Sequence, residues 1–85
     1  MSILHQADEL LHGARQDSYG DPVPNYVRIG AIWGALLDCD PLPAHVVALM
    51  MAGLKLCRAS QRDDDDDLID AAAYLQITAW ARELR

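Results

Sequence analysis

The stretch from Pro43 to Ala59 constrains the fold of this chain more than any other part of the sequence. Every residue from 46 to 54 is apolar or glycine, and the charged side chains of the stretch, Lys55 and Arg58, come near its end. A helix that is apolar on all faces is buried, either within its own domain or between subunits. The chain has 85 residues, and a domain of that size buries only about 60–65% of its unfolded surface. We therefore expect this stretch to be central and to lie at an oligomer interface.

The rest of the chain divides into three further helical segments, separated by two breaks that contain proline and by a loop from Ser60 to Asp66. We expect them over residues 2–16, from residues 22–25 to 37, and from residue 66 or 67 to 84. Apolar residues recur every three or four positions in each segment, and no alternating strand pattern competes. The short connections favour antiparallel neighbours. The sequence thus predicts a single all-α domain over residues 1–85, built as a four-helix bundle.

Four residues in these segments carry more specific expectations. Trp33 and Trp80 fall on the apolar stripes of their helices, so we predict that both are buried in the core. Gly53 costs about 1 kcal/mol relative to alanine inside a helix, so we expect another backbone to approach it closely. Cys57 lies in an apolar run, and a buried free thiol is the usual state there.

The charge of the chain is gathered in one acidic cluster. The net charge is −6, and the aspartates between residues 63 and 70 account for all of it. Phosphate backbones and anionic membrane surfaces both need a basic face, so neither duplex nucleic acid nor a membrane is expected as a partner. The chain also lacks a secretory leader and an apolar run of the ~20 residues that span a bilayer. We expect it in the cytoplasm.

Two groups of residues have the chemistry of a ligand site. Arg15, Tyr19 and Asn25 flank a glycine-containing loop, which either simply connects two helices or contacts a ligand through two donors and one stacking ring. Lys55 and Arg58 are three residues apart and share a helical face. They either extend into solvent at the end of their helix or form an anion site, in which arginine binds phosphate oxygens in pairs.

The acidic cluster supplies a third group. Asp66 or Asp67 shares a helical face with Asp70. These carboxylates either cap a helix beside a solvated loop or hold Mg²⁺, which binds one or two carboxylates together with water and substrate phosphates. Because the third and fourth segments are joined by a short loop, we expect Lys55, Arg58 and Asp70 in one neighbourhood. A plain ion pair is the alternative there.

The combined pattern resembles a known family. Its parts are Arg15-x-x-x-Tyr19-Gly20-Asp21, Asn25-Tyr26, Trp33, Lys55-x-x-Arg58 and Asp66/Asp67-x-x-Asp70. Together they look like a family of small phage-encoded helical proteins, which is similar in turn to the all-α nucleoside triphosphate pyrophosphohydrolases of the MazG type. The similarity covers about residues 7–80. It implies an oligomeric helical bundle, working in the host cytoplasm if phage-encoded, with a nucleotide-phosphate site between the third and fourth segments.

The resemblance also bears on catalysis. MazG-type enzymes hold Mg²⁺ with two acidic pairs on adjacent helices. Here Asp66 or Asp67 with Asp70 matches one pair, whereas Lys55 and Arg58 stand where the other would be. We therefore expect a homodimer or higher oligomer that binds a nucleotide or another phosphorylated ligand without efficient hydrolysis. The alternatives are a Mg²⁺-dependent pyrophosphohydrolase and a non-catalytic protein-interaction module, so the sequence leaves open whether the chain is an enzyme.

Overall fold

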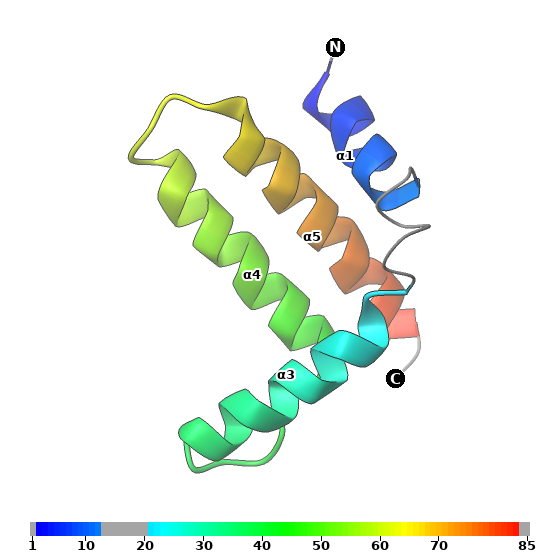
Figure 1. The fold of residues 1–85 in the computed structure, drawn as a ribbon, viewed down its shortest axis with the longest axis vertical. Helices are drawn as coiled ribbons and strands as arrows, with labels where there is room; N and C mark the ends of the chain where they lie inside the picture. Colours follow the sequence, from blue (N-terminus) through cyan, green and yellow to red (C-terminus); the bar gives the residue numbers. More distant parts are fainter. Residues whose placement is uncertain (1, 13–20, 84–85) are drawn as a thin grey trace.

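The chain is all-α over the residues that the structure, a computed structural model, describes, namely 2–12 and 21–83. Its helices carry the labels of Figure 1 and are α1 (Ile3–His12), α3 (Val23–Leu36), α4 (Ala44–Ala59) and α5 (Asp65–Glu83). The four predicted helices are confirmed, with ends shifted by one or two residues where the structure describes them. No described helix is long and apolar enough to cross a membrane.

The helices α4 and α5 form an antiparallel hairpin, as their short connection predicted. The first helix, α1, packs on the other side of α5, and α3 crosses beside the start of α4 (Figure 1). The helices therefore pack in the order α1, α5, α4, α3, and α4 and α5 together form the middle of the domain. One side of α4 faces α5 and α3, and no described element covers its opposite side.

Small side chains make up much of the core, which lets the helices approach closely. The buried cluster consists of Ala7, Leu11, Ala48, Ile69, Ala73 and Ile77. Trp80 is half-buried against this cluster, and its ring meets that of His12 edge-on at 5.5 Å. Trp33 is also only half-buried, because α3 packs mainly against α4. The prediction that both tryptophans are substantially buried is thus met in part, because both side chains are partly buried and neither is fully enclosed.

Two glycines fix the position of α3. The turn after α3 folds back so that the Leu42 N–H donates to the Gly30 carbonyl (3.0 Å) and the Cys39 N–H donates to the Gly34 carbonyl (2.9 Å). A Cβ on Gly30 would lie 2.0 Å from the Leu42 carbonyl oxygen, and one on Gly34 would lie 2.6 Å from the Asp40 carbonyl oxygen. The close backbone approach that the sequence suggested for Gly53 occurs instead at these two positions.

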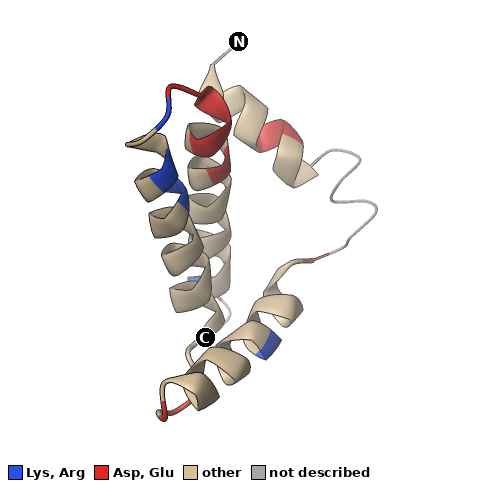
Figure 2. Ribbon diagram, turned by 60° about the vertical axis from the view of Figure 1, so that its left-hand side comes forward, with Lys and Arg blue, Asp and Glu red and all other residues tan. Residues whose placement is uncertain are grey.

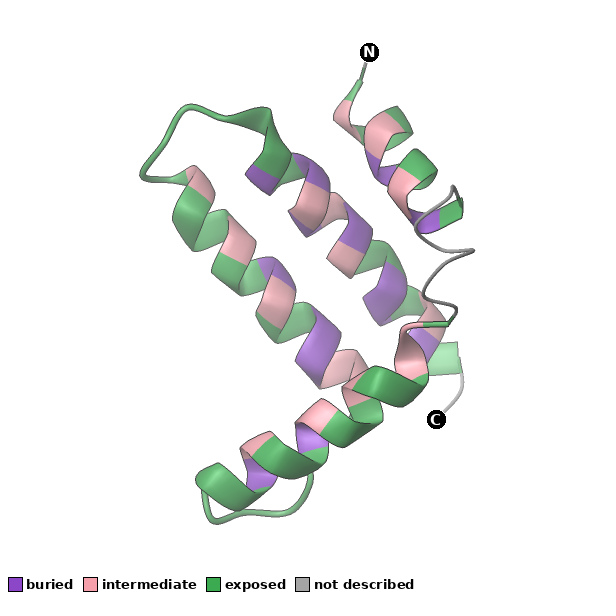
Figure 3. Ribbon diagram, in the orientation of Figure 1, coloured by how far each residue is buried: buried purple, intermediate pink, exposed green. Residues whose placement is uncertain are grey.

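The outer side of α4 departs most from expectation. Its large apolar side chains are 43–52% exposed, and they are Leu49, Met50, Leu54 and Leu56. Cys57 is exposed rather than buried. Apart from its chain neighbours and the backbone of α4 itself, no described atom lies within 4 Å of the Cβ that an alanine at position 53 would carry. A chain of this size has too few helices to cover both sides of α4, and Figure 3 shows the exposed residues along its free edge.

Candidate functional site

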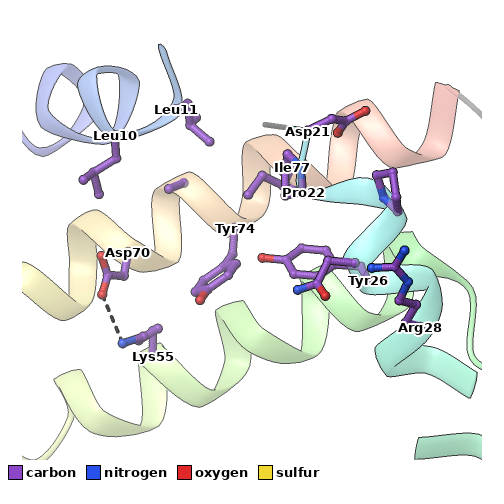
Figure 4. A pocket seen from close by; sticks show the side chains of 13 residues that line it. Leu10, Leu11, Asp21, Pro22, Tyr26, Arg28, Lys55, Asp70, Tyr74 and Ile77 are labelled. Carbon is purple, nitrogen blue, oxygen red and sulfur yellow. Dashed lines mark ion pairs between the residues drawn. The ribbon is translucent and has the colours of Figure 1, made fainter. Parts of the chain in front are cut away.

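A cleft of about 620 Å³ opens where the four helices meet. Its walls come from the end of α1, the start of α3, the second half of α4 and the middle of α5 (Figure 4). Apolar residues of α1 and α5 form one part of the lining, whereas the polar side chains come from α3, α4 and α5. The cleft therefore combines an apolar wall with a few convergent polar groups, as small-molecule sites do.

Lys55 and Asp70 form one end of the polar lining. The Lys55 Nζ lies 3.0 Å from the Asp70 Oδ2, across the α4–α5 hairpin (Figure 4). The two side chains are partly buried, with 17% and 31% of their surfaces exposed. They lie side by side, as the short connection between their helices predicted. Lysine has three N–H donors, so the contact with Asp70 leaves donor capacity that faces the cleft.

Two tyrosines occupy the middle of the cleft. Tyr26 comes from α3 and Tyr74 from α5, and their ring centroids are 6.4 Å apart with an angle of 39° between the ring planes. Both are half-buried against the core cluster. Figure 4 shows the Tyr26 ring directed from α3 toward Tyr74. The sequence placed Tyr26 in the family-like pattern, but it did not predict that Tyr26 and Tyr74 meet in a site.

The first turns of α3 supply Asn25 and Arg28. Both line the cleft and are exposed. Within the described residues Arg28 forms no ion pair, and it is the one charged residue of α3. Asp21 also lines the cleft, and its Oδ1 accepts a hydrogen bond from the Val23 N–H (3.0 Å), which holds the chain at the start of the helix. Sequence reasoning missed Arg28, although a lone base in an apolar helix was a usable signal.

Arg58 does not line the cleft. It belongs to a separate cluster with Arg62 and Asp67 at the hairpin end, where Figure 2 shows basic and acidic residues together. The Asp67 carboxylate is only 1% exposed and lies 2.7 Å from the Arg62 Nε and 3.3 Å from the Arg58 Nε. The hydrogen bond from Arg62 lowers the pKa of Asp67, and the positive charges of Arg62 and Arg58 act in the same direction against the effect of desolvation. Asp67 is therefore held between two arginines of this cluster and does not line the cleft.

The three aspartates predicted as possible metal ligands have different surroundings. Asp67 is engaged through both carboxylate oxygens by guanidinium groups, Asp66 is exposed, and Asp70 pairs with Lys55. No group of three or more His, Cys, Asp or Glu side chains among the described residues is arranged to hold a metal ion. Asp67 is thus taken up by arginine side chains, and Mg²⁺ binding through Asp66 and Asp70 stays a prediction. Asp66 or Asp67 was expected to cap the last helix. Asp64 does so instead, because its Oδ1 accepts a hydrogen bond from the Asp66 N–H (2.9 Å) in the first turn of α5.

Of the six predicted ligand contacts, the cleft brings together Asn25, Lys55 and Asp70. Arg15 and Tyr19 lie outside the described residues.

Comparison with known proteins places the chain among phage-related sequences. The model of a domain of unknown function, DUF6378, matches residues 2–82. The Gene 55 protein of Mycobacterium phage L5 is 37% identical over 78 residues, which make up 91% of this chain and 50% of that protein. The chain thus spans about half the length of this curated relative. No solved structure matches.

Proposed function

This chain belongs to the DUF6378 family, and we propose that it binds a nucleotide or another phosphorylated small molecule in the four-helix cleft. The observation that carries the proposal is the arrangement of the polar lining. Two tyrosine rings lie between Lys55 at one end and Arg28 at the other in the view of Figure 4. Cations suit phosphate groups and aromatic faces suit a nucleobase, so the cleft offers both kinds of contact at once.

Lys55 is the proposed phosphate contact on α4. Its pairing with Asp70 (3.0 Å) fixes the direction of the side chain and lowers the cost of keeping an ammonium group partly buried. The remaining Nζ donors are available to phosphate oxygens. Asp70 acts here as a positioning residue that orients the lysine.

Arg28 and Asn25 are the proposed contacts on α3. Arg28 is exposed, and within the described chain no acidic group neutralises it. Its guanidinium can therefore pair with two oxygens of one phosphate group. Asn25 adds amide donors and an acceptor at the same wall, and the faces of Tyr26 and Tyr74 offer stacking to a planar ring.

The residues favour binding over hydrolysis. On α4 the side chain facing α5 at this level is Lys55, and of the acidic cluster only Asp70 reaches the cleft. The resemblance to MazG-type proteins rests on the sequence pattern, and it supports a nucleotide ligand between the third and fourth helices. The loss of one acidic pair supports a non-hydrolysing relative of those enzymes. Host cytoplasm is the proposed place of action.

We also propose that the chain works as a homodimer or higher oligomer. The support is the apolar surface that four helices leave uncovered, both on the outer side of α4 and on α3, where Ile32 and Leu36 are 59% and 78% exposed. Exposed apolar patches of this kind mark interaction sites more often than free surface.

A thermal-shift experiment on the full chain tests the ligand proposal. Nucleoside triphosphates, pyrophosphate, inorganic phosphate and unphosphorylated nucleosides are compared with and without Mg²⁺. We expect triphosphates to raise the melting temperature without Mg²⁺ and nucleosides to act more weakly, because a ligand that binds the folded state stabilises it. Arg28→Gln should reduce the shift, whereas Arg82→Gln, at an exposed arginine outside the cleft lining, should not.

Two results would change the proposal. If no phosphorylated compound shifts the melting temperature at millimolar concentration, the interaction-module alternative becomes the better account. If pyrophosphate is released from a triphosphate only with Mg²⁺, the hydrolase alternative does.

A further inference from the structure

The two proposed phosphate contacts lie well apart along α4. Arg28 is two residues before Gly30, where α3 crosses α4 so closely that a Cβ on Gly30 would lie 3.3 Å from the Val47 side chain. Val47 and Lys55 are eight residues apart, which corresponds to about 12 Å along a helix axis. The backbone around Arg28 is displaced by this distance from the level of Lys55. Figure 2 accordingly shows the base of α3 well apart from those near the end of α4.

The tyrosine pair lies between these two levels. Because α5 runs antiparallel to α4, the residues that follow Asp70 lie progressively closer to the start of α4. Tyr74 is four residues after Asp70, about 6 Å along α5 and thus about halfway from Lys55 to the crossing. Tyr26 joins it there, with its ring centroid 6.4 Å from that of Tyr74. Figure 4 shows the resulting order, in which both rings lie between Lys55 and Arg28.

The rings make the middle of the cleft a place for a base and not for a phosphate group. An aromatic ring carries negative electrostatic potential on its faces, which repel an anion, whereas a planar base stacks on them. A centroid distance of 6.4 Å is that of two rings in direct contact, so a base stacks on the cleft-facing side of the pair and not between the rings. The cleft thus provides, in order, a cation, a stacking surface and a second cation.

We propose that the ligand of the cleft is a nucleoside that carries phosphate groups at both its 3′ and 5′ positions. The inference rests on the proposed function and specifies its ligand class. In such a bisphosphate the two phosphate groups leave the ribose in different directions, so one reaches Lys55 and the other reaches Arg28 while the base lies on the rings. A triphosphate has all of its phosphate groups on one side of the nucleoside. It can reach both cations only if its chain crosses the rings, where it displaces the base.

The number of cations supports separate phosphate groups. Among the described residues of the cleft lining only Lys55 and Arg28 are basic, and Lys55 shares its charge with Asp70. Sites that hold a triphosphate chain gather several cationic groups, including Mg²⁺, around adjacent phosphates. Here each end of the cleft offers one cation, which suits one phosphate group at each end.

Calorimetric titration of the full chain without Mg²⁺ tests the ligand class. Nucleoside 3′,5′-bisphosphates are compared with nucleoside 5′-diphosphates for adenosine, guanosine, cytidine and uridine. The two compounds of each pair are isomers, so they differ only in where the second phosphate group is attached. We expect the bisphosphate of at least one nucleoside to bind at least tenfold more tightly than its isomer, because only the bisphosphate reaches both cations while its base stacks. Equal affinities within every pair would overturn this inference but leave the proposed function standing, whereas no binding of any compound at millimolar concentration would overturn both.

Substitutions at the two ends of the cleft test the roles of the cations. Lys55→Gln, which keeps a donor for Asp70, and Arg28→Gln should each remove most of the preference for the bisphosphate. Arg82→Gln is the control, because this exposed arginine lies outside the cleft lining and its loss should leave the preference unchanged. Melting curves check that each variant folds. A preference that survives both cleft substitutions would overturn the inference. So would tighter binding of a single-stranded trinucleotide, whose inner nucleotide also has a phosphate on both sides, because it would replace the small molecule as the ligand.

Discussion

Replacing Gly30 by alanine is expected to destabilise the chain and to weaken the cleft. The new Cβ would lie 2.0 Å from the Leu42 carbonyl oxygen, about 1.4 Å short of ordinary van der Waals contact. The obstacle is backbone on both sides, so α3 and the turn after it must separate. Separation strains or breaks the hydrogen bond between the Leu42 N–H and the Gly30 carbonyl.

The magnitude follows from three contributions. Overpacking at a close contact costs about 1–3 kcal/mol, and a lost backbone hydrogen bond costs about 0.5–1.5 kcal/mol. Alanine offsets about 1 kcal/mol of this through its higher helix propensity. The net loss is about 0.5–3.5 kcal/mol, a substantial part of the roughly 4–13 kcal/mol that holds a chain of this length folded.

Urea denaturation followed by circular dichroism measures this loss, and Gly53→Ala is the matched control. The same substitution at Gly53 meets no described atom. At a dilution where the chain is monomeric it should therefore stabilise the protein by about 0.5–1 kcal/mol. If Gly30→Ala is as stable as the wild type, the backbone of Leu42 does not approach Gly30 as closely as described. Because α3 carries Tyr26 and Arg28, Gly30→Ala should also weaken ligand binding.

Three further predictions concern the ion pairs and the core. Arg62 holds the pKa of Asp67 below its ordinary value, so the stability from this pair is full above about pH 4 and is lost as the pH falls through the lowered pKa. Melting curves below pH 4 should therefore separate the wild type from Asp67→Asn, whose melting temperature falls less steeply; parallel curves would contradict this. Asp70→Asn should change the free energy of unfolding by about 1 kcal/mol or less, because its ion pair with Lys55 is partly solvated. Trp80→Ala should cost about 2 kcal/mol in urea denaturation, less than a fully buried tryptophan, and a wild-type value would show that Trp80 does not pack on the core.

The helices and the hairpin were predictable because their causes are local in sequence. Prolines stand at the starts of α3 and α4, and a polar run from Ser60 to Asp64 separates α4 from α5. A short loop between two helices forces them to be antiparallel neighbours, and this places Lys55 beside Asp70. Neither inference needs knowledge of a distant contact.

The cleft was not predictable in the same way, because it depends on where α3 crosses α4. That crossing is set by the approach of the Leu42 backbone to Gly30, a tertiary contact that leaves no helical period in the sequence. The tyrosine pair and Arg28 therefore could not be assigned to the site.

The sequence also did not predict which aspartate pairs with Arg58, for a related reason. Any of several aspartates could meet Arg58, and burial of Asp67 between two guanidinium groups decides among them. The apolar residues on the outer side of α4 predicted burial, but the described chain leaves them exposed. That prediction holds only if a second molecule covers this side of the helix.

Calorimetric titration of the full chain with a nucleoside triphosphate tests the central claim most directly. The account predicts binding with a submillimolar dissociation constant and at least tenfold weaker binding, equivalent to about 1.4 kcal/mol, for both Lys55→Ala and Arg28→Ala. Arg58→Ala is the control, because Arg58 pairs with Asp67 outside the cleft and should affect stability rather than affinity. The absence of binding at millimolar ligand, or unchanged affinity in both cleft variants, would contradict the account.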